Sequence, residues 1–154
     1  MRILDFLNKD AIELNLKSNN KKEVIEELVE VLNKKGLLLD KKAVLDSLFE
    51  REELGSTGIG QGIAIPHSKT KGVKELVGVL GISKKGVDFE ALDGEPVNIF
   101  FLLLTSEGAA GLMLKALARV SNFLKNKFYR KKILEAASKE DIIQIIEDEE
   151  KLKQ

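Results

Sequence analysis

Apolar positions recur at helical spacing toward both ends of the chain and in shorter runs in its middle, which predicts helices around a set of strands. A period-two alternation over residues 12–16 indicates an edge strand. One helix is predicted from the capping residue Asn20 to Gly36, and a second from Asp40 to about residues 51–53. Their apolar stripes comprise Val24, Leu28, Val31 and Leu32, and then Val44, Leu45, Leu48 and Phe49.

The middle of the chain contains the predicted strands. Short strands are expected over 63–65 and 76–82, and the proline after the first of them should end its pairing just before His67. Residues 93–96 form a predicted turn. The run over 97–104 is apolar on both faces, which is typical of a central strand covered by helices on either side.

Three further helices are predicted after this strand: over 108–125, over about 129–137, and from Ser138 to near the end of the chain. Strands in the middle and helices at both ends indicate one α/β layered domain, without a repeat or a linker. The helix over 108–125 offers two overlapping apolar faces, one with Ala110, Leu114, Leu117, Ser121 and Leu124, the other with Met113, Leu117, Val120 and Leu124.

The composition fits a globular domain and removes several kinds of chemistry. The 154 residues are 44% hydrophobic and 32% charged, a balance typical of a folded domain. Basic and acidic residues number 25 each, which argues against general nucleic-acid binding. Cysteine is absent, which excludes a disulfide, a thiolate nucleophile and a cysteine-bound metal. With a single histidine and no carboxylate cluster beside it, we expect no metal site.

The sequence gives no sign of membrane insertion. Its N-terminal segment includes Asp5 and no long apolar run, so we expect no secretory signal. The apolar run over 97–104 is too short to cross a bilayer. We therefore expect a cytoplasmic protein.

The stretch from Arg51 to His67 carries the candidate chemistry. Glycine lets backbone N–H groups approach a ligand closely, and a series of such groups can bind an anion. The stretch lacks the lysine of a P-loop and the spacing of a Rossmann fingerprint, so an ATP-dependent kinase is disfavoured and no cofactor is expected. The glycines between the arginine and the histidine are Gly55, Gly58, Gly60 and Gly62.

A phosphoryl group can instead be transferred onto His67. Neutral imidazole has a free lone pair at pH 7, because its ordinary pKa is about 6.5, and it can form a covalent phosphoramidate. Backbone amides near Thr57 and Gly58, the Thr57 hydroxyl and the Arg51 guanidinium are suitable donors to the phosphoryl oxygens. A purely structural interpretation stays open, in which His67 follows a strand, Arg51 pairs with a neighbouring glutamate and the glycines form a turn.

The string Arg-Glu-x-x-Gly-Ser-Thr-Gly-Ile-Gly-x-Gly-Ile-Ala-Ile-Pro-His, residues 51–67, closely resembles the active-site motif of enzyme IIA proteins of the bacterial sugar phosphotransferase system (PTS). The class is the one that includes fructose, mannitol and nitrogen-regulatory IIA proteins. Residues 86–89, 92–97 and 114–119 resemble further segments of that family, so the likeness covers nearly the whole chain. It implies a single domain over 1–150 with a mixed β-sheet and helices on both faces, as in the mannitol-type IIA fold.

The resemblance also implies the roles of residues and partners. His67 is the implied phosphorylated residue, and Arg51 matches the arginine near the phosphoryl group. The implied donor is the phosphohistidine of the phosphocarrier HPr or its nitrogen-branch counterpart. In the sugar-transport members the acceptor is a cysteine of a IIB domain.

One position departs from the family pattern. These proteins commonly carry a second active-site histidine where this chain has Met113. Methionine can neither carry charge nor donate to a phosphoryl oxygen, and at this spacing it can simply pack in the core. The nucleophile itself is retained, so we expect His67 to accept phosphate with altered transfer rates.

Two functions follow from these observations. The leading one is a phosphoryl carrier in sugar uptake, a phosphotransferase component. The alternative is a regulatory module whose phosphorylation state selects its protein partner, because two added negative charges can switch a surface. A structural protein without chemistry is the least favoured, since the motif is retained in full.

Overall fold

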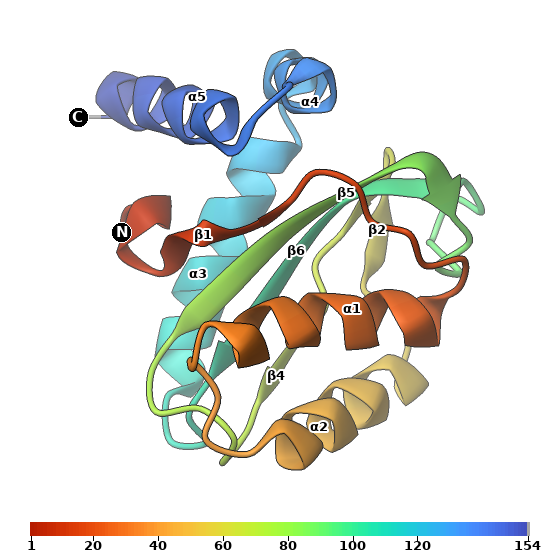
Figure 1. Cartoon of the computed structure of the whole chain (residues 1–154), viewed down its shortest axis with the longest axis vertical. Coiled ribbons are helices and arrows are strands. Elements are labelled where there is room, and N and C mark those ends of the chain that lie inside the picture. Colours follow the sequence, from red (N-terminus) through yellow and green to blue (C-terminus); the bar gives the residue numbers. More distant parts are fainter. Residues whose placement is uncertain (154) are drawn as a thin grey trace.

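The computed structural model describes residues 1–153 and shows a mixed six-stranded sheet between two layers of helices (Figure 1). The strands run in the order β1-β5-β6-β3-β2, and β4 also pairs with β6. The α/β fold with helices on both faces, expected from the sequence, is thereby confirmed. The elements are η1 (Ile3–Asp5), β1 (Leu7–Glu13), α1 (Lys21–Lys34), α2 (Lys41–Glu53), β2 (Gly58–Gly60), β3 (Ile63–Ala64), β4 (His67–Lys69), β5 (Val77–Val87), β6 (Val97–Thr105), α3 (Ala110–Leu124), α4 (Lys127–Glu135) and α5 (Lys139–Leu152).

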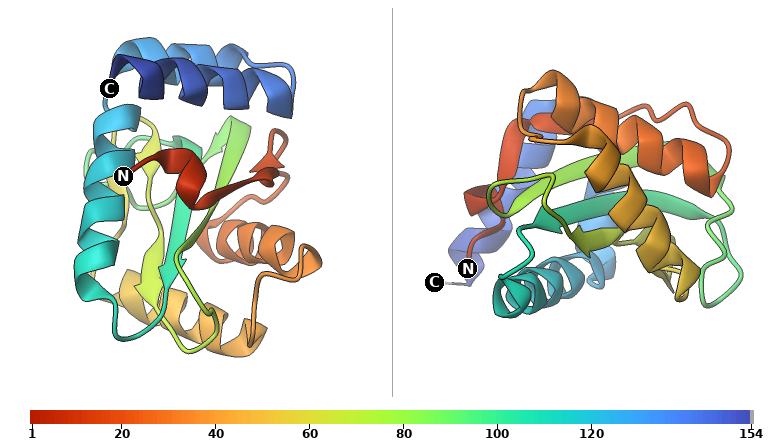
Figure 2. Two further views of the ribbon diagram at one scale, coloured as in Figure 1. Left: turned by 90° about the vertical axis from the view of Figure 1, so that its left-hand side faces the viewer. Right: turned by 90° about the horizontal axis from the view of Figure 1, so that it is seen from below.

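Strand β6 is the centre of the sheet and is apolar on both faces, as predicted. It pairs antiparallel with β5 and parallel with β3 and β4. Helices α1 and α2 cover one face, and α3 lies against the other, as the view from below in Figure 2 shows. The side chains of Phe100 and Leu102 point to the first layer, those of Phe101 and Leu103 to the second. Strand β6, to which β3, β4 and β5 are paired, is therefore fixed from both faces.

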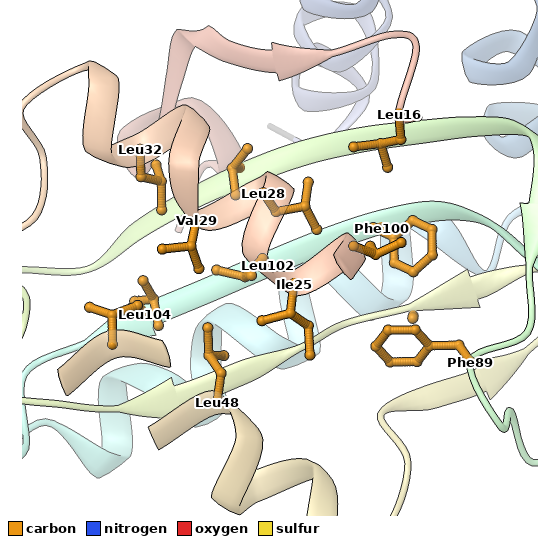
Figure 3. Packing of buried hydrophobic residues seen from close by; sticks show 14 of the residues in the cluster. Leu16, Ile25, Leu28, Val29, Leu32, Leu48, Phe89, Phe100, Leu102 and Leu104 are labelled. Atoms are coloured by element: carbon orange, nitrogen blue, oxygen red, sulfur yellow. The ribbon is translucent and has the colours of Figure 1, made fainter. Parts of the chain in front are cut away.

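The core under α1 and α2 is built from the predicted helical stripes. Ile25, Leu28 and Val29 of α1 pack on Phe100 and Leu102 of the sheet (Figure 3). All of these side chains are buried, and burial of each large apolar side chain stabilises the fold by about 1.5–3 kcal/mol.

The helix starts are set by side-chain caps that the sequence predicts correctly. The side chain of Asn20 accepts the Glu23 N–H at 2.9 Å, and that of Asp40 accepts the Ala43 N–H at 3.1 Å. Ser138 caps α5 in the same way. Each cap satisfies a backbone donor that would otherwise have no partner within the helix.

The structure corrects several predicted boundaries. The edge strand β1 covers Leu7–Glu13 rather than 12–16, and it pairs parallel with β5. Its polar residues 8–10 are solvent-exposed and interrupt the alternation that would have revealed it. Strand β5 extends to Val87, and α4 starts at Lys127 because Asn126 caps it. Strands β2 and β4 were not predicted.

The two faces proposed for α3 have different fates. Met113, Val120 and Leu124 are buried against the sheet. Ala110 and Leu114 of the alternative face are exposed, Leu114 by 69%. The face of α3 that contains Ala110 and Leu114 therefore points to the surface.

A buried ionic cluster fixes α3 to both ends of the described chain. Arg119 of α3 donates to both carboxylate oxygens of Glu149 in α5, at 3.0 and 2.5 Å. Glu150 accepts the backbone N–H of Ile3 at 2.7 Å. Such two-pronged arginine–carboxylate pairs fix geometry as well as charge.

Candidate active site

His67 is the first residue of β4, the short strand that pairs with the central strand β6. The sequence-based expectation that pairing stops at Pro66 is wrong. Proline lacks an N–H, but its carbonyl oxygen accepts the Leu103 N–H at 2.9 Å. Pairing with β6 then resumes, with His67 opposite Leu103. The main chain at His67 is therefore held on both sides of the residue.

The imidazole ring of His67 is oriented by a hydrogen bond to its own strand. Its Nδ1 lies 2.7 Å from the carbonyl oxygen of Ile65. A carbonyl oxygen can only accept, so Nδ1 carries the proton in the neutral ring. Nε2 then has the free lone pair, and it is the nitrogen available to an electrophile.

The environment lowers the pKa of His67 below its ordinary value. The largest cause is burial, because the half-buried ring loses hydration of its charged form, and the charge of Arg51 acts in the same direction. The hydrogen bond to Ile65 and the charge of Glu52 oppose this shift without reversing it. The ring therefore stays neutral, and nucleophilic, at neutral pH.

A pH titration will test this shift. Because His67 is the only histidine of the chain, its ring signals in NMR spectra are unambiguous. We expect a midpoint below about 6.5, the value of an unfolded histidine. The depressed pKa also adds stability that is complete above pH 6.5 and is lost as the pH falls toward the folded pKa. The urea-unfolded chain is the control, and an equal or higher midpoint in the folded protein would contradict the assignment.

Arg51 projects from the last turn of α2 toward His67. Its Nη1 donates to the carbonyl oxygen of Gly55 at 2.8 Å, which ties the side chain to the start of the glycine loop. Within residues 1–153 it forms no ion pair, so the interpretation that it pairs with a neighbouring glutamate is not supported. Its remaining donors are available to an anion beside His67.

Thr57 and Gly58 are the other residues expected to donate to the phosphoryl group. The Thr57 N–H and hydroxyl both donate to the Glu52 carboxylate, and the side chain is only 3% exposed. The Gly58 N–H donates to the Ser56 hydroxyl at 3.0 Å. A Cβ at Gly58 would lie 2.9 Å from Ala91, so glycine is required there for close packing. In this structure these donors form hydrogen bonds within the loop and to α2.

Glu52 and Lys21 hold the glycine loop in place, and sequence reasoning did not single them out. The Lys21 ammonium lies 3.0 Å from the buried Glu52 carboxylate, which also holds Thr57. The pair links the start of α1, the end of α2 and the glycine loop. The only local signal was the position of Glu52 directly after Arg51 in the motif. Successive residues of a helix point about 100° apart, so Glu52 points into the core when Arg51 points to the surface.

Two hollows flank His67 and share Arg51, His67 and Leu117 in their walls. The α2 hollow has a volume of about 710 Å³ and lies between α2, β4 and the start of α3. The loop hollow has a volume of about 520 Å³ and lies between the glycine loop and the second half of α3. The other residues that line the α2 hollow are Ser47, Glu50, Glu53, Leu54, Ser68, Lys69, Ala110, Met113 and Leu114. Those of the loop hollow are Ser56, Thr57, Ile59, Ile65, Leu92, Ser121 and Lys125.

Met113 forms part of the wall of the α2 hollow and is only 5% exposed. Its side chain packs in the core that α3 shares with the sheet. It provides no hydrogen-bond donor to a group on His67.

Exposed leucines surround the site. Leu54 and Leu114 border the α2 hollow with exposures of 85% and 69%, and Leu92 borders the loop hollow with 79%. Exposed apolar groups gathered at one place are typical of a protein-binding surface. In the described part of the chain, no helix is long and apolar enough to span a membrane, and no three potential metal ligands cluster together.

The chain belongs to the family described as phosphoenolpyruvate-dependent sugar phosphotransferase system, EIIA 2, whose model matches residues 5–149. It is thus a phosphotransferase component, as the sequence motif predicted. It is 45% identical over 151 residues to the PTS system fructose-specific EIIABC component of Bacillus subtilis, covering 98% of this chain but only 24% of that relative. It is 39% identical over 134 residues to the nitrogen regulatory protein of Bradyrhizobium diazoefficiens, covering 86% of each.

Solved structures agree with this assignment. The nitrogen regulatory protein IIA-Ntr of Neisseria meningitidis is 35% identical, with a TM-score of 0.86, covering 94% of this chain and 98% of that one. Two structures of the Escherichia coli mannitol IIA protein show the same fold at 20% and 19% identity, with TM-scores of 0.76 and 0.77. They cover 90% and 92% of this chain and 97% and 96% of theirs. The second is a complex with phosphorylated enzyme IIB. The mannitol-type IIA fold is therefore confirmed.

Proposed function

We propose that the protein is a phosphoryl carrier that accepts a phosphoryl group on Nε2 of His67 from the phosphohistidine of an HPr-like protein. The observation that carries the proposal is the hydrogen bond from Nδ1 to Ile65, which leaves Nε2 unprotonated beside Arg51. The Nε2 lone pair forms the new bond to phosphorus while the donor's P–N bond breaks, and the donor's ring keeps that electron pair. Arg51 supplies positive charge to the equatorial oxygens.

The acceptor in this proposal is a cysteine of a IIB domain. The mannitol relative is a precedent for docking between IIA and phosphorylated IIB. The exposed leucines Leu54 and Leu114 border the α2 hollow beside His67. Their burial by a partner would exclude water from the reactive bond.

Regulation is the second candidate, and the relatives named nitrogen regulatory protein favour it, since this chain matches them over most of their length. In that role the phosphoryl group would change which protein binds. Because Met113 provides no donor, slow onward transfer is more compatible with a switch than with rapid sugar uptake.

The test is incubation of the protein with a phosphorylated HPr-like carrier, followed by 31P NMR. We expect one phosphoryl group per chain, on Nε2 of His67. Subsequent transfer to a IIB cysteine would assign the protein to transport, whereas phosphorylation-dependent capture of a regulatory target without transfer would assign it to regulation. An unlabelled native protein contradicts the carrier function.

A Met113→His variant will show how the methionine at the family's second-histidine position affects the rate of phosphoryl transfer. A histidine at this position can donate to a phosphoryl oxygen, and a charge-assisted hydrogen bond contributes about 1.5–3 kcal/mol. Met113 lines only the α2 hollow, so a roughly tenfold faster transfer, 1.4 kcal/mol being a factor of ten, would place the phosphoryl group in that hollow. A phosphoryl group on the side of the glycine loop leaves the rate at its native value.

Met113→Leu is the matched control, because it keeps the volume and adds no donor. It should transfer at the native rate. Equal rates in all three proteins would show that position 113 does not touch the transferred group.

A further inference from the structure

One stripe of α3 passes both hollows beside His67. Met113, Leu117, Ser121 and Lys125 follow one another at intervals of four residues, which places them on one side of the helix. Met113 lines the α2 hollow, Ser121 and Lys125 line the loop hollow, and Leu117 lines both. The stripe is therefore apolar on one side of His67 and polar on the other.

The two hollows also differ in charge. The α2 hollow contains two carboxylates, Glu50 and Glu53, in addition to its basic residues. No acidic residue lines the loop hollow, and its charged side chains are Arg51 and Lys125, which flank the neutral ring of His67. A phosphoryl group with nearly two negative charges is repelled by nearby carboxylates and attracted by unpaired cations. The loop hollow is the electrostatically favoured side.

Most donors on the loop side of this hollow are already engaged. The Ser56 hydroxyl donates to the carbonyl oxygen of Phe89 at 2.7 Å, and Thr57 donates to Glu52. By contrast, the Ser121 hydroxyl and the Lys125 ammonium have no hydrogen-bond or ion-pair partner within residues 1–153. They are the donors of this wall that a new ligand can use without breaking an existing interaction.

We propose that the loop hollow is the phosphoryl subsite of phosphorylated His67, and that its ligands are Arg51, Ser121 of α3 and Lys125, the C-cap residue of α3. This inference rests on the proposed phosphorylation of His67. Lys125 lies on the exposed end of the helix, and its four-carbon stem allows the ammonium to reach toward the phosphoryl oxygens. Ser121, one turn closer to Leu117, supplies a hydroxyl donor. The pair replaces the charge and the donor that Met113 cannot provide.

The experiment compares Ser121→Ala, Lys125→Gln and the conservative Lys125→Arg with the native protein. Lys115→Gln is the matched control, because Lys115 is exposed on the same helix and lines neither hollow. Each protein is phosphorylated by a phosphorylated HPr-like carrier. The rate of transfer, the hydrolysis half-life of phosphohistidine and the pH titration of its 31P signal are then measured.

We expect Lys125→Gln to slow transfer about tenfold, the effect of losing one charge-assisted hydrogen bond. The second ionisation of the phosphoryl group should shift to higher pH, because the cation that favours the dianion is gone. Ser121→Ala should slow transfer to a smaller extent. Lys125→Arg, which keeps the positive charge, should restore the rate and the titration relative to Lys125→Gln, and Lys115→Gln should behave like the native protein. A change in folding alone would not shift the 31P titration.

Rates and 31P titrations of Lys125→Gln and Ser121→Ala that equal those of Lys115→Gln would overturn the subsite while leaving His67 phosphorylation intact. A native protein that accepts no phosphoryl group would refute both the subsite and the carrier function. The two failures are therefore distinguishable in the same assay.

Discussion

Replacing His67 by alanine is expected to abolish phosphoryl transfer from an HPr-like donor. Cysteine is absent and His67 is the only histidine, so the chain has no other imidazole and no thiol that could take the phosphoryl group. The loss should be complete within the detection limit, since a covalent intermediate cannot form without its nucleophile. The measurement is incorporation of radioactive phosphate per chain after a fixed time.

Arg51→Lys separates the role of the nucleophile from that of the charge. Lysine keeps the positive charge but loses the two-pronged geometry and the hydrogen bond to Gly55. We expect slower incorporation with the same final stoichiometry. Equal incorporation in His67→Ala and the native protein would place the phosphoryl group on another residue and exclude the proposed function.

Replacing Glu52 by alanine is expected to destabilise the protein by about 3 kcal/mol, the usual cost of removing one partner of a buried ion pair. Lys21 would lose its nearest carboxylate, and the buried Thr57 N–H and hydroxyl would lose their acceptor. The loop beside His67 would lose its anchor to α2, so transfer should slow as well. Urea unfolding, with a slope matching that of the native protein, measures the change.

Asp46→Ala is the control for Glu52→Ala. Asp46 also lies on α2 and pairs with Lys42, but both side chains are largely exposed. Exposed pairs contribute little to stability, so the midpoint of unfolding should stay close to native. If Glu52→Ala shifts the midpoint of unfolding as little as Asp46→Ala does, the buried pair does not support the loop.

Local signals in the sequence sufficed for much of the fold. Asn20, Asp40 and Ser138 each cap a helix by accepting the backbone N–H of the residue three positions later. Such a cap depends only on neighbouring residues, so a short stretch of sequence is enough to predict it. The central strand was predictable because both of its faces are apolar.

The missed elements depend on partners far along the chain. Strand β4 has three residues and begins after a proline, so only its pairing with β6, more than 30 residues away, defines it. The same applies to the site. His67 and Arg51 could be predicted from their motif, whereas Lys21 reaches Glu52 across 31 positions and no local spacing reveals the contact.

The hydrogen bonds that fix the backbone before and after His67 affect how a partner distinguishes the phosphorylated protein from the unphosphorylated one. The Pro66 carbonyl oxygen and the residues of β4 are fixed to β6, and the ring is fixed to Ile65. Phosphorylation at Nε2 then changes the electrostatic potential around His67 while the backbone and the ring orientation stay almost unchanged. Recognition of the modified form should consequently weaken as salt is added, because screening acts on charge and leaves shape complementarity intact.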